Sequence, residues 1–472
     1  MEKAKINYQN RNILPYFFQG WTSKLATILS WLVAGILALL PFHAFLTVWL
    51  STAIGHYALL RLWKEFLLLI LIVGSTYILF KNKELRKKFL GSRIAQLIAI
   101  YYLVSLVWGA IAYGLDKVTL KALGYGFTVN LRFLVFFMAI WVIASLAPML
   151  KEGWPRLLFI PAAAVIVIGL MQRLVLPYDV LKHFGYSSDT IFPYATINHN
   201  INYPRIMSTL RGANPLGAYL LLVLSGTMAL LFGLKKHRRL WALLGFAGLL
   251  ALFFTYSRGA WVGLVLGLTY LFWTVLKKKK AKKIAAAGLI LLILAVAGLL
   301  LAFRHNPTFE NYFFHTEKNS QVAVSSNAGH ASAFRSGLND VLNEPLGRGV
   351  GTAGPASVYN DQKTRVSENY FIQIAQEVGW IGLVLFLAIN FLVARELWLR
   401  RTDTLSLGLL ASLAGLTFVS LVSHVWTDDT LAYLWWGLAG VALAPLQPLT
   451  VNHLLFTKRT KSIAKNKLKR YD

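Results

Sequence analysis

Arg258 is the only charged residue in the apolar stretch FFTYSRGAWVGLVLG, which occupies positions 253–267. One membrane crossing needs about 20 apolar residues, so the longer apolar run at 240–276 predicts two helices joined by a turn at 256–259. Arg258 would then lie at the start of the second helix. The first amides of a helix and its positive dipole end favour an anion, and a guanidinium beside them completes a phosphate clamp.

Two more arginines precede an apolar segment in RIMSTLRGANPLGAYLLL, positions 205–222. Asn214 is a candidate N-cap and Pro215 suits the first helical position, which explains part of the pattern without any binding role. It does not explain Arg205 and Arg211. Because Arg211 again places a cation about one turn before a helix, Arg211 and Arg258 together predict a diphosphate site.

The remaining candidates each have an ordinary structural interpretation beside a chemical one. Arg173, in GLMQRLVLP, either points inward or extends its side chain to the membrane surface. His330 lies in SSNAGHASAFR, five residues before Arg335, where a loop histidine is usually just solvated. Glu368 begins an apolar segment, where a carboxylate favours the helix dipole. Its chemical role would be to take a proton from an attacking hydroxyl.

The composition decides which elements position these residues. The 472-residue chain is 57% hydrophobic and 14% charged, with a mean hydropathy of +0.56. These values and the recurring apolar runs predict an all-α polytopic membrane protein. The absence of cysteine from the sequence excludes disulfides, thiolate metal sites and a cysteine nucleophile. No Walker-type or GxGxxG loop is present in the sequence, which argues against a nucleotide-driven motor.

Twelve transmembrane helices are expected, with both termini in the cytoplasm of a multi-pass protein of the cell membrane. This orientation puts most Lys and Arg residues, including the KKKKAKK run at 277–283, on the cytoplasmic side. The net charge of +29 is then a topology signal that also suits anionic lipid, and no nucleic-acid partner is expected. The expected spans are 25–50, 65–80, 94–113, 130–149, 157–176, 214–234, 239–256, 259–276, 284–303, 368–394, 404–425 and 430–447.

Two external segments stand out by length within what we expect to be a single membrane domain, 1–472. These are the loop at 177–213 and the larger loop at 304–367, and long loops in compact proteins are often functional. In the second loop, HASAFRSGLNDVLNE (330–344) predicts a short amphipathic helix, and GRGVGTAGP (347–355) predicts a glycine-rich turn. We expect this larger loop to take part in catalysis.

Several of these segments resemble the O-antigen ligase and Wzy-type polymerase superfamily. The resemblance is carried by TYSRGAWVGL, by ANPLGAYL after an arginine, by the long late loop and by ENYFIQIAQEVGWIG, and it covers about 205–390. Ligases of the family carry a histidine, then Asn, Ser or Gln, then nine residues and G-x-x-G. Asn369, Gly379 and Gly382 match that spacing, whereas Glu368 occupies the histidine position.

The resemblance implies a glycosyltransferase that uses a polyprenyl-diphosphate-linked glycan donor outside the cytoplasmic membrane. A hydroxyl of a glycan or glycolipid acceptor would displace the diphosphate with inversion, with Glu368, His330 and Arg258 as the catalytic residues. Since arginines can disperse the charge of the leaving group, neither a metal ion nor a cofactor is expected. The residues expected to bind substrate are Arg173, Arg205, Arg211, Arg258, Arg335 and Asn369.

Alternatives stay open at this point. A Wzy-type polymerase would use the same donor, and a transporter or flippase of polyprenyl-linked glycans would also have many spans. A transporter should show charge near the bilayer midplane or broken helices, whereas the polar groups here collect on one face. A scaffold role leaves the external arginines unexplained. The base is also undecided: Glu368 is fixed on a helix, while a histidine such as His330 is the side chain best suited to exchange protons near working pH.

Overall fold

A computed structural model describes residues 13–445 apart from 199, 234–236, 307–308 and 315–325. It is almost entirely helical, as expected, with one two-stranded sheet in the described residues. The described helices of four or more residues are α1 (Ile13–Leu39), α2 (His43–Ile54), α3 (Tyr57–Leu60), α4 (Trp63–Lys81), α5 (Lys83–Leu90), α6 (Arg93–Gly114), α7 (Leu120–Ala144), α8 (Met149–Leu174), α9 (Ala213–Gly233), α10 (Arg238–Phe254), α11 (Arg258–Val275), α12 (Lys279–Ala302), α14 (Ser326–Asn343), α15 (Tyr370–Leu399), α16 (Thr404–Ser420) and α17 (Asp429–Leu443).

Each of the twelve expected spans overlaps a helix or, for the first, α1 and α2 together, and the fourth, expected at 130–149, is shifted to Leu120–Ala144. Within the described residues, eight helical segments are long and apolar enough to cross a membrane, and α16 is a shorter apolar helix. The chain is therefore a polytopic α-helical membrane protein. The count of twelve crossings and the side of each loop stay predictions. Both termini, expected in the cytoplasm, lie outside the described residues.

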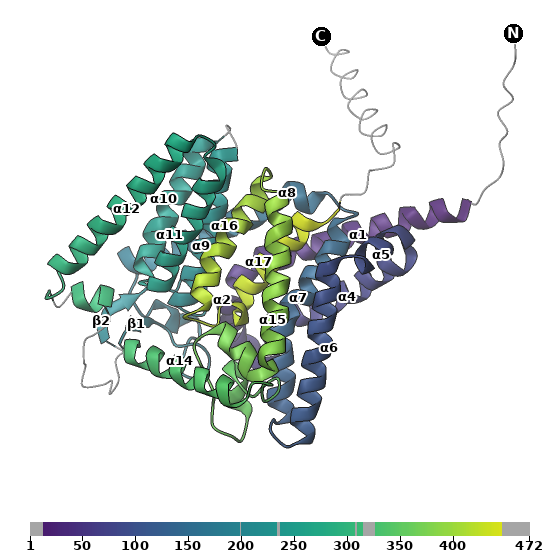
Figure 1. Ribbon diagram of the computed structural model, residues 1–472, viewed down its shortest axis with the longest axis horizontal. Coiled ribbons are helices and arrows are strands. Elements are labelled where there is room, and N and C mark those ends of the chain that lie inside the picture. Colours follow the sequence, from purple (N-terminus) through teal and green to yellow (C-terminus); the bar gives the residue numbers. More distant parts are fainter. Residues whose placement is uncertain (1–12, 199, 234–236, 307–308, 315–325, 446–472) are drawn as a thin grey trace, which may run out of the picture.

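The two long loops lie at one end of the helices (Figure 1). The segment at 177–213 contains a short 3-10 helix, Val180–Phe184, and a hairpin of β1 (Ala195–Ile197) and β2 (Asn200–Arg205). The strands are antiparallel, with Ala195 opposite Arg205. In the larger loop, the expected amphipathic helix is present as α14, which is longer than predicted and lies across the lower end of the bundle in this view.

The glycine-rich turn packs into a break in α15. Gly379 interrupts that helix with φ 70°, a left-handed conformation that favours glycine. The freed backbone groups bond to the turn, with Arg348 N donating to Gln376 O at 2.9 Å and Trp380 N to Pro345 O at 3.1 Å. Glu377, just before the break, is buried and accepts from the amide of Gly351 at 2.8 Å. The turn thereby fixes the orientation of the first turns of α15.

Small residues bring α11 and α16 into close contact. A Cβ atom on Gly415 would lie only 2.3 Å from the carbonyl oxygen of Gly263, so a side chain at this crossing would force the helices apart. Close packing through glycine is a common way for helices to associate in a membrane. The crossing holds the start of α11, with Arg258, beside the end of α16.

Candidate active site

A cavity of about 640 Å³ opens where α9, α11, α15 and α17 begin and α16 ends. Its size falls within the roughly 300–1,000 Å³ of typical ligand sites. Five of the residues singled out in the sequence line it together. They are Arg205, Arg211, Arg258, His330 and Glu368.

Arg205 and Arg258 form one cationic wall. Arg205 is the last residue of β2, and its guanidinium donates to Thr255 O at 2.7 Å and to Asn214 Oδ1 at 2.6 Å. Burial, together with the charge of Arg258, lowers the pKa of Arg205 to about 10, so it remains charged at neutral pH. The expected N-cap at Asn214 is wrong, because α9 already begins at Ala213 and the Asn214 amide instead accepts from Arg205.

Arg258 is the first residue of α11, as the apolar pattern predicted, and the turn before it comprises only 255–257. Its guanidinium donates to Phe314 O at 3.0 Å and to Asn327 Oδ1 at 2.7 Å. Asn327 lies on α14, so Arg258 ties the larger loop to the cavity. The N-cap Ser257 makes no side-chain capping bond, which leaves the first amides of α11 open to an anion.

Arg211 lines the same cavity from the connection before α9. Its Nε is 2.9 Å from Asp428 Oδ2, and the Arg211 side chain is 45% exposed. Asp428 also caps α17, with its Oδ1 accepting from Leu431 N at 3.1 Å. Because this ion pair is made through Nε, most N–H donors of the Arg211 guanidinium remain available to a ligand.

His330 and Glu368 contact each other at the cavity, from His330 Nδ1 to Glu368 Oε2. Both side chains are partly exposed, and Glu368 has a φ of 54°, an unusual left-handed value outside glycine. The hydrogen bond from His330 lowers the pKa of Glu368 against the opposing effect of burial. The carboxylate is therefore ionised at neutral pH, and the imidazole is held by its Nδ1.

Asn369, the neighbour of Glu368, does not line the cavity. It caps α15, with Oδ1 accepting from the amides of Phe371 and Ile372 at 3.0 Å. Its Nδ2 donates to Leu421 O at 3.0 Å, at the end of α16. These bonds give Asn369 a positional role in fixing Glu368, while the substrate contact expected for it stays a prediction.

Arg173 and Arg335 are not among the residues that line the cavity. Arg173, in the last turn of α8, lies over the Phe254 ring at 5.5 Å and borders a separate small cavity of about 20 Å³ beside Arg205. Arg335 is exposed on α14, one position beyond the cavity-lining Phe334. Neither arginine lines the cavity, although Arg173 lies close to it at Arg205.

His424 lines the same cavity and was not recognised in the sequence. It lies between α16 and α17, and its Nε2 is buried without a hydrogen-bond partner in the described part of the chain. Burial lowers its pKa to about 4, with Glu368 acting to raise it and Arg211 to lower it further. A lone histidine near a helix end gave no signal in the sequence, because only the packing of α15 and α17 brings it to the cavity.

Comparison with known families adds to this geometry. Residues 243–387 match the model of the family described as O-antigen ligase. The matched segment runs from α10 to the middle of α15 and includes Arg258, His330 and Glu368. No curated protein matches the chain. The match over this segment supports the resemblance of this integral membrane protein to the O-antigen ligase and Wzy-type superfamily.

Proposed function

We propose that the protein transfers a glycan from polyprenyl diphosphate to an acceptor hydroxyl on the outer side of the cytoplasmic membrane. The observation that carries this proposal is the convergence of Arg205, Arg211 and Arg258 on one cavity that also holds His330 and Glu368. The family match supports an activity of the O-antigen ligase or polymerase type. Both reactions use a lipid-linked donor and need the same site for its diphosphate.

The three arginines suit a diphosphate leaving group. They come from three separate segments, and two of them lie beside the first turns of α9 and α11. Guanidinium forks bind phosphate oxygens bidentately, and helix N-termini add oriented amides. As the bond between the anomeric carbon and the diphosphate oxygen breaks, negative charge grows on that oxygen. Cations already in place stabilise this charge without reorganisation.

The His330–Glu368 pair suits removal of the acceptor proton. With Nδ1 engaged by the ionised Glu368, the other ring nitrogen of His330 has its lone pair available. The acceptor oxygen forms a bond to the anomeric carbon, its proton passes to His330, and polyprenyl diphosphate departs. Glu368 orients the imidazole and stabilises the imidazolium, as carboxylates do in other catalytic pairs. In this mechanism His330 is the base and Glu368 supports it, so both residues take part.

The transporter alternative receives less support. Transporters often have a broken helix at the substrate site, and α15 is broken at Gly379. In this protein, however, the glycine-rich turn fills the break. Non-helical backbone at membrane depth is stable when it is buried in protein in this way. The cationic groups meet instead at the ends of helices, where a membrane-anchored diphosphate would lie.

The test is transfer by the purified full-length protein in lipid nanodiscs, with a polyprenyl-diphosphate-linked glycan as donor. Addition of glycan repeats as a ladder would identify a polymerase, and capping of a second acceptor would identify a ligase. Movement of intact donor across a sealed vesicle membrane, without release of polyprenyl diphosphate, would replace the proposal with transport.

A further inference from the structure

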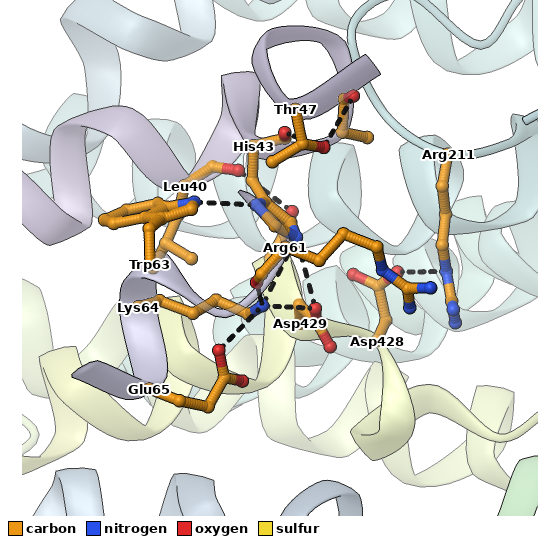
Figure 2. Close-up of polar contacts among 12 residues, drawn as sticks. Leu40, His43, Thr47, Arg61, Trp63, Lys64, Glu65, Arg211, Asp428 and Asp429 are labelled. Carbon is orange, nitrogen blue, oxygen red and sulfur yellow. Dashed lines mark hydrogen bonds and ion pairs between the residues drawn. The ribbon is translucent and has the colours of Figure 1, made fainter. Parts of the chain in front are cut away.

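A second cavity of about 280 Å³ adjoins the first and shares Arg211 and Asp428 with it. It is enclosed by the beginnings of α2, α3 and α17 and by the loop around Thr190. Figure 2 shows Arg61, Asp428 and Arg211 side by side at this place. The residues that line it are His43, Ala44, Thr47, Tyr57, Arg61, Thr190, Ile191, Arg211, Asp428, Asp429 and Thr430.

The lining is strongly polar for a place where membrane helices meet. Only Ala44 and Ile191 among the lining residues are aliphatic, and the others carry hydroxyl, imidazole, carboxylate or guanidinium groups. Polar groups in a site fix orientation and provide specificity. The volume lies just below the roughly 300 Å³ at which drug-sized sites begin, so the cavity suits a group the size of one sugar ring.

The floor of the second cavity is a charge-balanced buried network. Lys64 Nζ lies 2.9 Å from Asp429 Oδ2 and 3.2 Å from Glu65 Oε2 (Figure 2). Arg132, from α7, contacts both carboxylates, at 2.6 Å for Glu65. Two cations thus neutralise two anions, and Arg211 neutralises Asp428 in the shared wall.

Arg61 is the charge that these pairs leave uncompensated. In the part of the chain that the structure describes, its guanidinium makes no ion pair or hydrogen bond, and it stacks only over the Tyr57 ring at 5.6 Å. The side chain lines the cavity and is partly exposed. A partly buried cation among hydroxyl groups favours a ligand that carries one anionic group and several hydroxyls.

We propose that the second cavity binds the terminal sugar of the acceptor, and that Arg61 recognises a carboxylate or phosphate on that sugar. This inference rests on the proposed function, which requires two substrates to meet. The donor diphosphate occupies the first cavity, and the Arg211–Asp428 pair lines both cavities. A sugar in the second cavity therefore lies next to the donor, at this shared pair.

A binding experiment tests the site without any turnover. Methyl β-D-glucuronide and its uncharged counterpart, methyl β-D-glucoside, are titrated against the full-length protein in nanodiscs by saturation-transfer NMR. Loss of one charge-assisted bond is expected to weaken glucuronide binding by about 10- to 100-fold in Arg61→Gln, with little change for the glucoside. Arg61→Lys should fall between, because an ammonium lacks the planar fork. Lys117→Gln, an exposed site between α6 and α7, is the matched control.

Turnover then tests the assignment to the acceptor. In the transfer assay described above, the glucuronide should compete with the acceptor and leave the Michaelis constant for the donor unchanged. Equal glucuronide binding by Arg61→Gln and the unchanged protein would overturn the site. Binding at Arg61 with competition against the donor, or with no inhibition, would overturn the acceptor assignment. Binding at Arg61 in a protein that releases no polyprenyl diphosphate would instead mark failure of the proposed function.

Discussion

Arg211 Nε lies 2.9 Å from Asp428 Oδ2, in the wall shared by the two cavities. Asp428 is largely buried and also caps α17, while Arg211 is about half exposed. The carboxylate therefore fixes one edge of the guanidinium and leaves its other donors directed to solvent or ligand. A fixed fork loses less entropy on binding than a free side chain, which favours recognition of phosphate.

Arg211→Lys and Arg258→Lys should each weaken donor binding by about 10- to 100-fold, because a point charge cannot replace a bidentate fork. Binding of a polyprenyl-diphosphate-linked glycan to the protein in nanodiscs measures this directly. Arg335→Lys is the comparison, since Arg335 lies outside the cavity lining and its replacement should leave donor binding unchanged. Unchanged binding in both Arg211→Lys and Arg258→Lys would remove the basis for the diphosphate site.

The sequence was informative where signals are local. Helix positions followed from apolar runs, and the start of α11 at Arg258 followed from a run too long for one crossing. The glycine-rich turn was predicted because left-handed conformations favour glycine, and Gly347, Gly349, Gly351 and Gly354 all have positive φ. The sequence did not predict the hairpin at 195–205, whose strands are only three and six residues long.

Long-range pairing was not predictable from one sequence. Lys64, Glu65, Arg132 and Asp429 lie on three helices far apart in the chain, and nothing in their spacing shows that they meet. Arg132 lies halfway along α7, whereas the polar groups were expected to collect on one face. His424 and Arg61 were missed for the same reason, since packing alone places them at cavities.

The buried network predicts a large effect on stability. Lys64→Met should lower the free energy of unfolding by about 3–5 kcal/mol, because removal of one partner leaves a buried carboxylate uncompensated. Lys182→Met, which removes an exposed pair with Asp179 at 2.5 Å, should leave the thermal midpoint unchanged. Thermal unfolding of both variants in nanodiscs provides the comparison. Equal midpoints for the two variants would contradict the role assigned to the network.

Cysteine labelling tests the orientation of the chain. The sequence contains no cysteine, so a single introduced thiol reports its own position. In intact cells an impermeant maleimide should label Ser336→Cys, on the exposed face of α14, and should not label Arg239→Cys at the start of α10. Permeabilised cells should allow labelling of both. The opposite pattern would place the cavities in the cytoplasm and exclude the proposed site of transfer.

His424 predicts a pH dependence of stability. Burial lowers its pKa from 6.5 to about 4 in the folded protein, so the unfolded chain takes up a proton at a higher pH than the folded one. The stabilisation is therefore fully present above pH 6.5 and is lost as the pH falls toward 4. The thermal midpoint should fall between pH 7 and pH 5, and less steeply in His424→Gln. Parallel pH profiles for the two proteins would show that His424 is not the group responsible.

The last prediction assigns the base. If Glu368 orients His330 and His330 takes the proton, His330→Ala should bind donor normally and turn over about 10²- to 10⁴-fold more slowly. Glu368→Gln should also bind donor, and its turnover should decline because the glutamine cannot stabilise the imidazolium. Glu368→Asp, which keeps the charge on a shorter side chain, should lie between Glu368→Gln and the unchanged protein. The measurement is donor binding and release of polyprenyl diphosphate, determined separately for each variant.

The outcomes separate the two residues because each variant removes one of the two groups that could accept the proton. The hydrogen bond from His330 lowers the pKa of Glu368, which makes the carboxylate a weak base while this contact is intact. Normal turnover by His330→Ala together with loss of turnover in Glu368→Gln would make Glu368 the base, freed by removal of its partner. Full activity in both variants would exclude both residues as the base. The candidate would then be His424, the remaining histidine that lines the cavity in the described residues. His424→Gln would then be expected to show the rate loss with donor binding retained.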